Sequence, residues 1–302
     1  MATSLSVPTY HDLPVTAPGL GNFTIHYISA GAPTDPTLLL LHGFPSSSTQ
    51  YRNVIPLLSD SYHVLAPDLP GYGLTTSPAE MKYTFANLTA AIAAWLLALE
   101  ISSYAVYVFD YGAPVAWRLA LEKPASIKAI ISQNGNAYDA GFGHPFWTPI
   151  EALWNETKPN SVADREWLRE NYLTIPATKG QYYTGFPASD HELVDPVQPT
   201  TDFWMNLHGR ENQERQLDLF YDYRTNLPLY SKIQKWFRES QVPMLAVWGK
   251  ADPIFVWEGA EAFRKDLPEA EVHALEAGHF VLETKGWEVA QLIKGFLGRN
   301  RW

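Results

Sequence analysis

Short continuous runs of apolar residues recur along the chain and constrain its fold more than any other feature. A strand of this kind is buried on both faces, as in a parallel sheet that helices cover on each side. Residues 84–100 and 113–124 have helical patterns and lie between runs, and this alternation predicts an α/β fold. A half-buried strand is expected at residues 23–30, and the continuous runs occupy residues 37–42, 62–68, 104–110, 127–134 and 244–249.

The alternation stops in the middle of the chain. From about Tyr138 to Phe237 the sequence is rich in Trp, Tyr, Phe and Pro and contains no convincing buried strand. We therefore expect a mostly helical insertion after the sixth strand, at residues 138–237. The expected α/β core then consists of residues 1–137 and 238–302, and its last element is an amphipathic helix near the carboxyl terminus.

Composition argues against several classes of partner. The net charge of −10 disfavours nucleic acid and anionic membranes, since both require a basic surface. The chain has no cysteine, which excludes disulfides, thiolate metal sites and a cysteine nucleophile. Because the first residues lack the pattern of a signal peptide and no apolar run approaches ~18 residues, we expect a cytoplasmic protein. A monomer and a homodimer are both compatible with the sequence.

Titratable residues follow two of the predicted strands and recur near the end of the chain. Asp110 ends the run at 104–110, Asp252 follows the run at 244–249, and His279 lies among small residues. In such sheets ligands bind beyond the carboxyl ends of the strands, and the order acid, acid, histidine is that of a catalytic triad. Structural roles are the alternative: Asp110 as a helix cap, Asp252 as a turn residue and His279 as a core histidine.

Five segments of the chain resemble one family, in its order and at its spacings. The family is the α/β hydrolases, in particular the branch with an aspartate nucleophile, which contains epoxide hydrolases and haloalkane dehalogenases. The resemblance implies a mostly parallel α/β-hydrolase sheet flanked by helices, with the insertion forming a helical cap over the active site. The segments are HGFPSSSTQYR (42–52), PDLPGYGLTTSP (67–78), VFDYGAP (108–114), VWGKADPIF (247–255) and AGHFVLE (277–283).

The resemblance implies a role for each motif residue. Asp110 would attack the substrate, and His279, oriented by Asp252, would take a proton from the hydrolytic water. Backbone N–H groups of Phe44 and Tyr111 would form the oxyanion hole. A carboxylate nucleophile suits a saturated carbon, because the alkyl ester that it forms can be hydrolysed whereas the ether formed by a serine cannot.

The triad acid has an alternative position in some relatives, after the preceding strand. This chain offers only Asn134 and Asn136 there. Asparagine cannot offset a charged imidazolium, so Asp252 is the expected orienting acid.

Epoxide hydrolysis and dehalogenation differ in what the leaving group requires from the enzyme. An opened epoxide needs a proton, which the resembling hydrolases supply from cap tyrosines, whereas a halide needs N–H donors. The segment FYDYRTN (220–226) resembles the tyrosine-bearing motif and assigns Tyr223, while KGQYYTGFP (179–187) offers Tyr182 or Tyr183, of which we prefer Tyr183.

We therefore expect a cofactor-independent and metal-independent enzyme that hydrolyses a small hydrophobic epoxide with water. The side chains of Phe44 and Tyr111 carry no N–H group, which disfavours dehalogenation. Tyr111 follows the nucleophile, at a position where epoxide hydrolases usually have tryptophan. This difference leaves the identity of the substrate undecided. The alternatives are a haloalkane dehalogenase, a lactone or ester hydrolase that uses the same triad, and a non-catalytic ligand-binding homologue.

Overall fold

The fold is known from a computed structural model that describes residues 7–302. In this part of the chain eight strands form one sheet in the order β1-β2-β4-β3-β5-β6-β7-β8. Neighbours from β4 to β8 pair in parallel, while β2 pairs antiparallel with both β1 and β4. The strands are β1 (Thr9–Ala17), β2 (Gly21–Ala30), β3 (Thr37–Leu41), β4 (His63–Pro67), β5 (Tyr104–Phe109), β6 (Ile127–Gln133), β7 (Met244–Gly249) and β8 (Glu271–Leu275).

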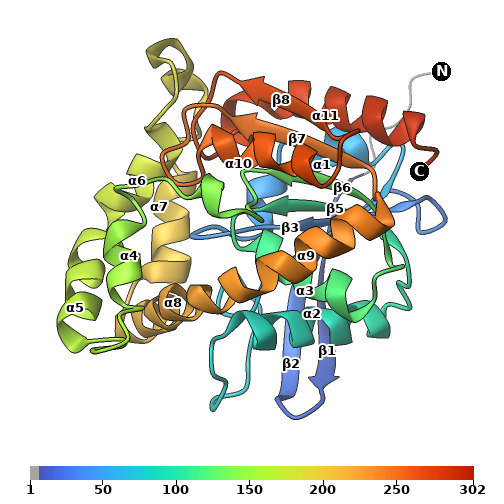
Figure 1. Ribbon diagram of the computed structural model, residues 1–302. Helices are drawn as coiled ribbons and strands as arrows, with labels where there is room; N and C mark the ends of the chain where they lie inside the picture. Colours follow the sequence, from blue (N-terminus) through green and yellow to red (C-terminus); the bar gives the residue numbers. More distant parts are fainter. Residues whose placement is uncertain (1–6) are drawn as a thin grey trace.

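Helices cover both faces of the sheet (Figure 1). Side chains of α1 and α11 pack on one face, and those of α2, α3, α9 and α10 pack on the other. The expected α/β class, a mostly parallel sheet flanked by helices, is confirmed. The helices are α1 (Ile55–Leu58), α2 (Phe85–Ala98), α3 (Gly112–Glu122), α4 (Thr148–Ala152), α5 (Val162–Asn171), α6 (Ile175–Tyr183), α7 (Gln198–Asp202), α8 (Arg210–Asp222), α9 (Leu227–Ser240), α10 (Trp257–Ala262) and α11 (Leu282–Arg299).

Strand β3 shows why its sequence is a continuous apolar run. Leu38 and Leu40 pack in the cluster that contains α1 and α11, whereas Leu39 and Leu41 pack in the cluster that contains α2 and α3. Successive side chains of a strand point to opposite faces, so both faces require apolar residues when both are covered. All four leucines are fully buried.

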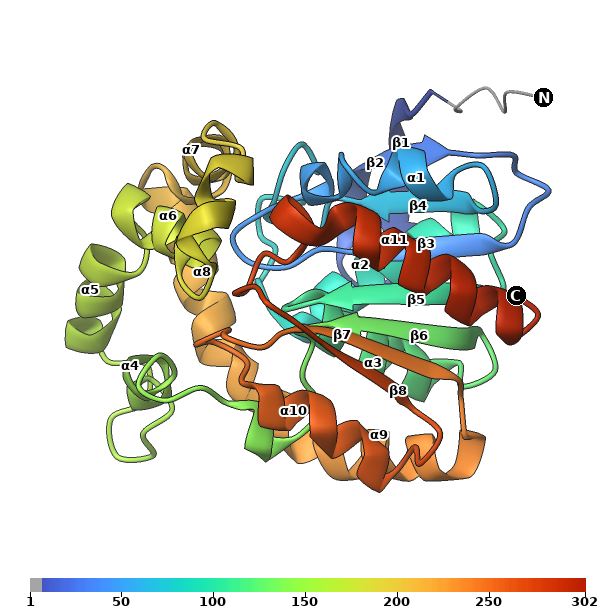
Figure 2. The same cartoon turned by 90° about the horizontal axis from the view of Figure 1, so that it is seen from above.

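Helices α4 to α8 follow β6 and lie beyond the carboxyl ends of the parallel strands (Figures 1 and 2). Helix α9 also falls largely within the segment 138–237, but it packs against α3 beside the sheet. Its buried residues Tyr230, Ile233 and Phe237 join the core cluster of that face. The division of the chain into core and cap therefore stays a prediction, and α4 to α8 are the helices that overhang the strand ends.

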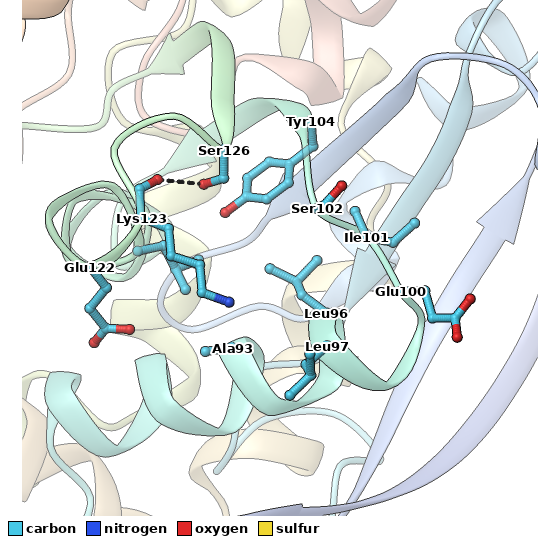
Figure 3. A pocket seen from close by; sticks show the side chains of 11 residues that line it. Ala93, Leu96, Leu97, Glu100, Ile101, Ser102, Tyr104, Glu122, Lys123 and Ser126 are labelled. Atoms are coloured by element: carbon cyan, nitrogen blue, oxygen red, sulfur yellow. Dashed lines mark hydrogen bonds between the residues drawn. The ribbon is translucent and has the colours of Figure 1, made fainter.

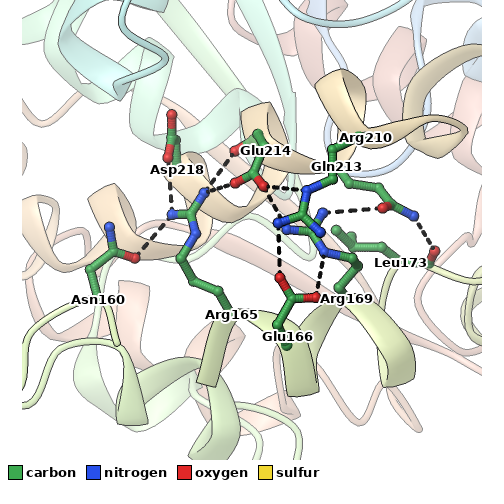
Figure 4. A network of polar contacts seen from close by, with 9 residues as sticks. All are labelled: Asn160, Arg165, Glu166, Arg169, Leu173, Arg210, Gln213, Glu214 and Asp218. Carbon is green, nitrogen blue, oxygen red and sulfur yellow. Dashed lines mark hydrogen bonds and ion pairs between the residues drawn. The ribbon is translucent and has the colours of Figure 1, made fainter. Parts of the chain in front are cut away.

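An ion-pair network joins α5 to α8 (Figure 4). Glu214 on α8 pairs with Arg165, with Arg169 at 2.7 Å and with Arg210 at 2.8 Å. Arg165 also pairs with Asp218 at 3.0 Å. The two arginine side chains from α5 are almost buried, at 13% and 9% exposed, so screening by water is reduced and the network stabilises this pair of helices.

Replacing Glu214 by Gln should lower the free energy of unfolding by about 2 kcal/mol, between the values for exposed and for buried pairs. The variant keeps the shape of the side chain but leaves three arginines without their shared carboxylate. Urea unfolding measures the change. The control is Glu211→Gln on the same helix, whose side chain is 82% exposed, and a loss of equal size there would contradict the account.

None of the described helices is both long and apolar enough to cross a membrane.

Candidate active site

Asp110 lies at a sharp turn between β5 and α3. Its backbone has φ of +46°, a left-handed conformation that is uncommon for residues other than glycine. Gly112 makes the turn possible, because a Cβ atom there would lie 2.1 Å from the carbonyl oxygen of Leu41. The side chain of Asp110 is thereby presented at the carboxyl edge of the sheet, where it is 4% exposed.

Three residues far apart in the sequence meet at this edge. The Nδ1 atom of His279 lies 2.7 Å from Oδ2 of Asp252, and its Nε2 atom lies 3.9 Å from Oδ2 of Asp110. Nε2 has no hydrogen-bond partner among the described residues. The imidazole is therefore oriented by one acid and aimed at the other, the geometry of a base that acts on a water held between them.

The structure gives roles to two residues at the end of β6, of which the sequence indicated only Asn134, as the occupant of the alternative acid position. Asn134, which follows β6, donates from its amide to Oδ2 of Asp252 at 2.7 Å and accepts the backbone N–H of Gly249 at 3.0 Å. Gln133 donates to the backbone carbonyl of His279 at 2.7 Å. Asn134 thus positions the acid, and Gln133 positions the segment that carries the histidine.

Backbone N–H groups surround the Asp110 carboxylate. The N–H of Phe44 donates to Oδ1 at 2.7 Å, and the N–H of Tyr111 also stabilises the charged form. Both are the groups expected to form an oxyanion hole. Donors that hold one carboxylate oxygen are already in place for the oxyanion that forms when the same carboxyl carbon is attacked.

Burial and charge change the protonation of the site. Burial raises the pKa of Asp110 to about 6, although His279 and the two backbone N–H groups act in the opposite direction. Burial alone would lower the pKa of His279, but Asp252 and Asp110 together outweigh it and the net pKa is raised. Asp110 is therefore a carboxylate above about pH 6, and the imidazolium is stabilised by two acids.

The two tyrosine segments lie in different places. Tyr223 is fully buried, and its ring packs on those of Tyr111 and Trp147 at 5.9 and 4.6 Å. Burial, followed by the neighbouring hydroxyl of Tyr230 and the charge of Asp110, raises the pKa of Tyr223 well above its usual value. It is thus a protonated phenol within electrostatic range of Asp110, but, like Tyr182 and Tyr183, it does not line the cavity at Asp110.

Tyr182 and Tyr183 do not line the cavity at Asp110. The hydroxyl of Tyr182 hydrogen-bonds to Asp202, and its ring stacks on Phe280. The half-buried Tyr183 has its ring against His191 at 5.4 Å. Neither placement supplies the second proton donor expected from this segment, and Gln181 is the residue of α6 that faces the cavity.

Two adjoining cavities reach the triad. A small one of about 10 Å³ is lined by Asp110, Phe44 and Tyr111, among others, and a larger one of about 250 Å³ is lined by His279 and mostly apolar side chains. They share three lining residues: Phe146, Gln181 and Ile254. The substrate therefore has an apolar space beside the reactive groups.

A separate cavity of about 410 Å³ lies between α2 and α3 (Figure 3). It is lined by Tyr104, which begins β5, and by the side chain of Lys123, among others. Asp110 lies past the opposite end of that strand. This cavity is therefore remote from the triad.

No group of three or more acidic or histidine side chains among residues 7–302 is arranged to hold a metal ion. The buried polar atoms at the site are instead arranged around the triad. This arrangement is suited to attack on a substrate by the carboxylate of Asp110, followed by hydrolysis of the resulting ester with His279 as the base.

Comparison with known proteins places the chain in a family. Residues 36–286 match the α/β hydrolase fold. The chain belongs to the α/β hydrolase fold family. This α/β hydrolase is 42% identical to an uncharacterized hydrolase from Saccharomyces cerevisiae over 277 residues, which are 91% of this chain and 94% of the relative.

Two further relatives carry more specific names. Epoxide hydrolase 3 of Mus musculus is 32% identical over 301 residues, which cover 94% of the hydrolase described here and 76% of the mouse protein. The crystal structure of haloalkane dehalogenase DbeA from Bradyrhizobium elkani superposes with a TM-score of 0.76 at 19% identity, covering 98% of this chain and 99% of that one. The second similarity shows the shared fold.

Proposed function

We propose that this α/β hydrolase is an epoxide hydrolase that acts through an ester of Asp110. The observation that carries the proposal is a carboxylate at the elbow after β5, held by the N–H of Phe44 and faced by Nε2 of His279. A carboxylate at this position suits attack on a saturated carbon. The similarity to mouse epoxide hydrolase 3 supports the same reaction.

The first step would form the ester. Asp110 attacks a ring carbon, the ring C–O bond breaks, and its electron pair stays on the oxygen, which takes a proton from Tyr223. The buried neutral phenol of Tyr223 supports this role. Tyr183, the second donor that the sequence predicts, has no such support from its position.

The second step would hydrolyse the ester. His279 takes a proton from water, the hydroxide adds to the carboxyl carbon of Asp110, and the N–H groups of Phe44 and Tyr111 hold the oxyanion. When the intermediate collapses, the imidazolium of His279 protonates the departing alkoxide to give the diol. The proton left on Asp110 balances the phenolate at Tyr223, so one epoxide and one water give one diol.

The alternative reaction, dehalogenation, requires N–H donors that bind the departing halide, and one of these is missing from the described part of the chain. Trp147 is the only tryptophan among residues 7–302 that lines the cavity at Asp110, and its indole N–H already donates to the carbonyl of Ile254 at 2.8 Å. An indole already engaged in this way is a weak halide ligand. The dehalogenase reaction therefore stands second.

The test is product analysis with the wild-type protein. It is supplied in turn with styrene oxide, with 1-bromohexane and with a lactone of similar size, and diol, halide and carboxylic acid are measured. The proposal predicts diol formation from the epoxide as the fastest reaction. Faster halide release or acid formation would replace it with the corresponding alternative.

The pH dependence should have an acid limb near pH 6. Asp110 attacks only as a carboxylate, and burial raises its pKa to about 6, so kcat/KM should fall about tenfold per unit as the pH drops below that value. The neutral form of His279 is also lost in acid, which slows hydrolysis of the ester and therefore lowers kcat. Circular dichroism at each pH identifies any unfolding, and a rate that stays constant down to pH 4.5 would contradict the assignment.

Asn134→Gly should slow turnover about tenfold or more, the value of a hydrogen bond to a charged group. Glycine accepts the left-handed φ of +49° at this position, so the change removes the side-chain hydrogen bond to Asp252 and the two to the backbone of Gly249 without straining the chain. The slower step should be ester hydrolysis, because Asp252 acts through His279. The control is Asn160→Gly, at another left-handed asparagine in the loop before α5, and equal slowing by both would refute the role.

A further inference from the structure

One buried polar group at the site remains unexplained by the proposed steps. The side chain of Gln181 is 8% exposed, and its carbonyl oxygen has no hydrogen-bond partner among the described residues. Buried amides in proteins are almost always paired, because an unpaired one loses its hydration without compensation. Gln181 lines both the cavity at Asp110 and the cavity at His279. The unpaired oxygen is an acceptor and cannot bind an epoxide oxygen, but the amide nitrogen of Gln181 also donates to none of the described residues, so its N–H groups are available to a ligand in the cavity.

Gln181 is held firmly in relation to the triad. Its neighbour Tyr182 hydrogen-bonds to Asp202 and stacks on Phe280, with ring centroids 3.9 Å apart. Phe280 directly follows His279 in the chain. Just beyond α6, the carbonyl oxygen of Thr184 lies so close to Gly278 that a Cβ atom there would be 1.9 Å from it. The end of α6 is therefore packed on the segment that carries His279, which fixes Gln181 at the junction of the two cavities.

The sizes of the cavities indicate how a substrate is arranged. A cavity of about 10 Å³ at Asp110 accepts about one water-sized group. The adjoining cavity of about 250 Å³ is larger than the ~150 Å³ that holds a benzene molecule in an engineered protein cavity. An unsubstituted ring CH₂ group fits the first space, and an aryl or short alkyl group fits the second.

We propose that Gln181 donates an amide N–H to the ring oxygen of a terminal epoxide, whose single apolar substituent lies in the larger cavity. This inference rests on the proposed function. The amide stabilises charge on the oxygen as the ring opens, and the proton itself still comes from Tyr223. Asp110 then attacks the unsubstituted carbon, because a substituent on the attacked carbon has no space in the smaller cavity.

The experiment follows ester formation in a His279→Gln background, by intact mass at short times, with styrene oxide and with trans-stilbene oxide. Adding Gln181→Leu should slow ester formation from styrene oxide about 10²-fold, the value of one oxyanion donor. Gln181→Asn, with a shorter amide, should slow it as well and guards against a folding defect specific to leucine. The control is Lys179→Leu, which changes an exposed residue of the same helix and should leave the rate unchanged.

The outcomes separate this inference from the function on which it rests. Ester formation at an unchanged rate in both Gln181 variants would overturn the role of Gln181 and leave the epoxide hydrolase proposal standing. Trans-stilbene oxide reacting as fast as styrene oxide would overturn the terminal-epoxide arrangement. If no epoxide forms an ester in the His279→Gln background, the proposed function fails and this inference fails with it.

Discussion

Asp110→Asn is expected to lower turnover by at least about 10⁴-fold, the size of effect seen when a triad residue is removed. The amide is a poor nucleophile, and its shape preserves the surroundings of the elbow. The variant should fold. Because burial raises the pKa of Asp110, the folded protein disfavours its charge above about pH 6, and a neutral amide should melt at or above the wild-type temperature at pH 8.

The matched control is Asp266→Asn. Asp266 is also buried, at 7% exposed, but it hydrogen-bonds to Tyr138 and pairs with Arg238 away from the triad. Its replacement should leave turnover within about twofold, and any loss of stability there should not remove activity. Mass spectrometry first excludes protein in which the introduced asparagine has deamidated to aspartate. If the Asp110→Asn variant then keeps more than a tenth of wild-type turnover, Asp110 is not the nucleophile.

His279→Gln is expected to lower turnover to a similar extent for a different reason. Glutamine cannot take the proton from water, so the first step should proceed and the ester should accumulate. Intact mass after exposure to styrene oxide should show a gain equal to the whole epoxide. A gain equal to an alkyl group alone, after exposure to a haloalkane, would instead identify a dehalogenase.

The double variant Asp110→Asn with His279→Gln is the control for that experiment. It should show no mass gain, since the acceptor carboxylate is missing. An adduct that persists in the double variant would place the covalent chemistry on another residue. An His279→Gln protein that turns over at the wild-type rate would remove the histidine from the mechanism.

The buried strands were predictable from the sequence because both of their faces are covered. The apolar run at 104–110 coincides with β5, and the run at 37–42 with β3. Strands β1 and β8 were not predicted. They lie at the two edges of the sheet, most of their residues are exposed or half-buried, and such strands carry little of the apolar pattern on which the prediction depends.

The residues that meet at the candidate site were predictable where each lies in a short sequence motif. Asp110, Asp252 and His279 are brought together as the motifs indicated. The sequence placed Asn134 at the alternative acid position, but its hydrogen bond to Asp252 was not predictable, because no motif named here pairs an asparagine with the triad acid. The role of Gln181 was not predictable either, because successive side chains on a helix point about 100° apart and the sequence does not show which residue of the segment faces the cavity.

The most direct test of the central claim, an ester of Asp110, is a single turnover in H₂¹⁸O with the wild-type enzyme in excess over styrene oxide. If Asp110 forms the ester and water attacks its carboxyl carbon, the diol from the first turnover contains only ¹⁶O. The peptide that contains Asp110 then gains one ¹⁸O atom. If instead the diol carries ¹⁸O and the peptide remains unlabelled, water attacks the epoxide directly and the account is wrong.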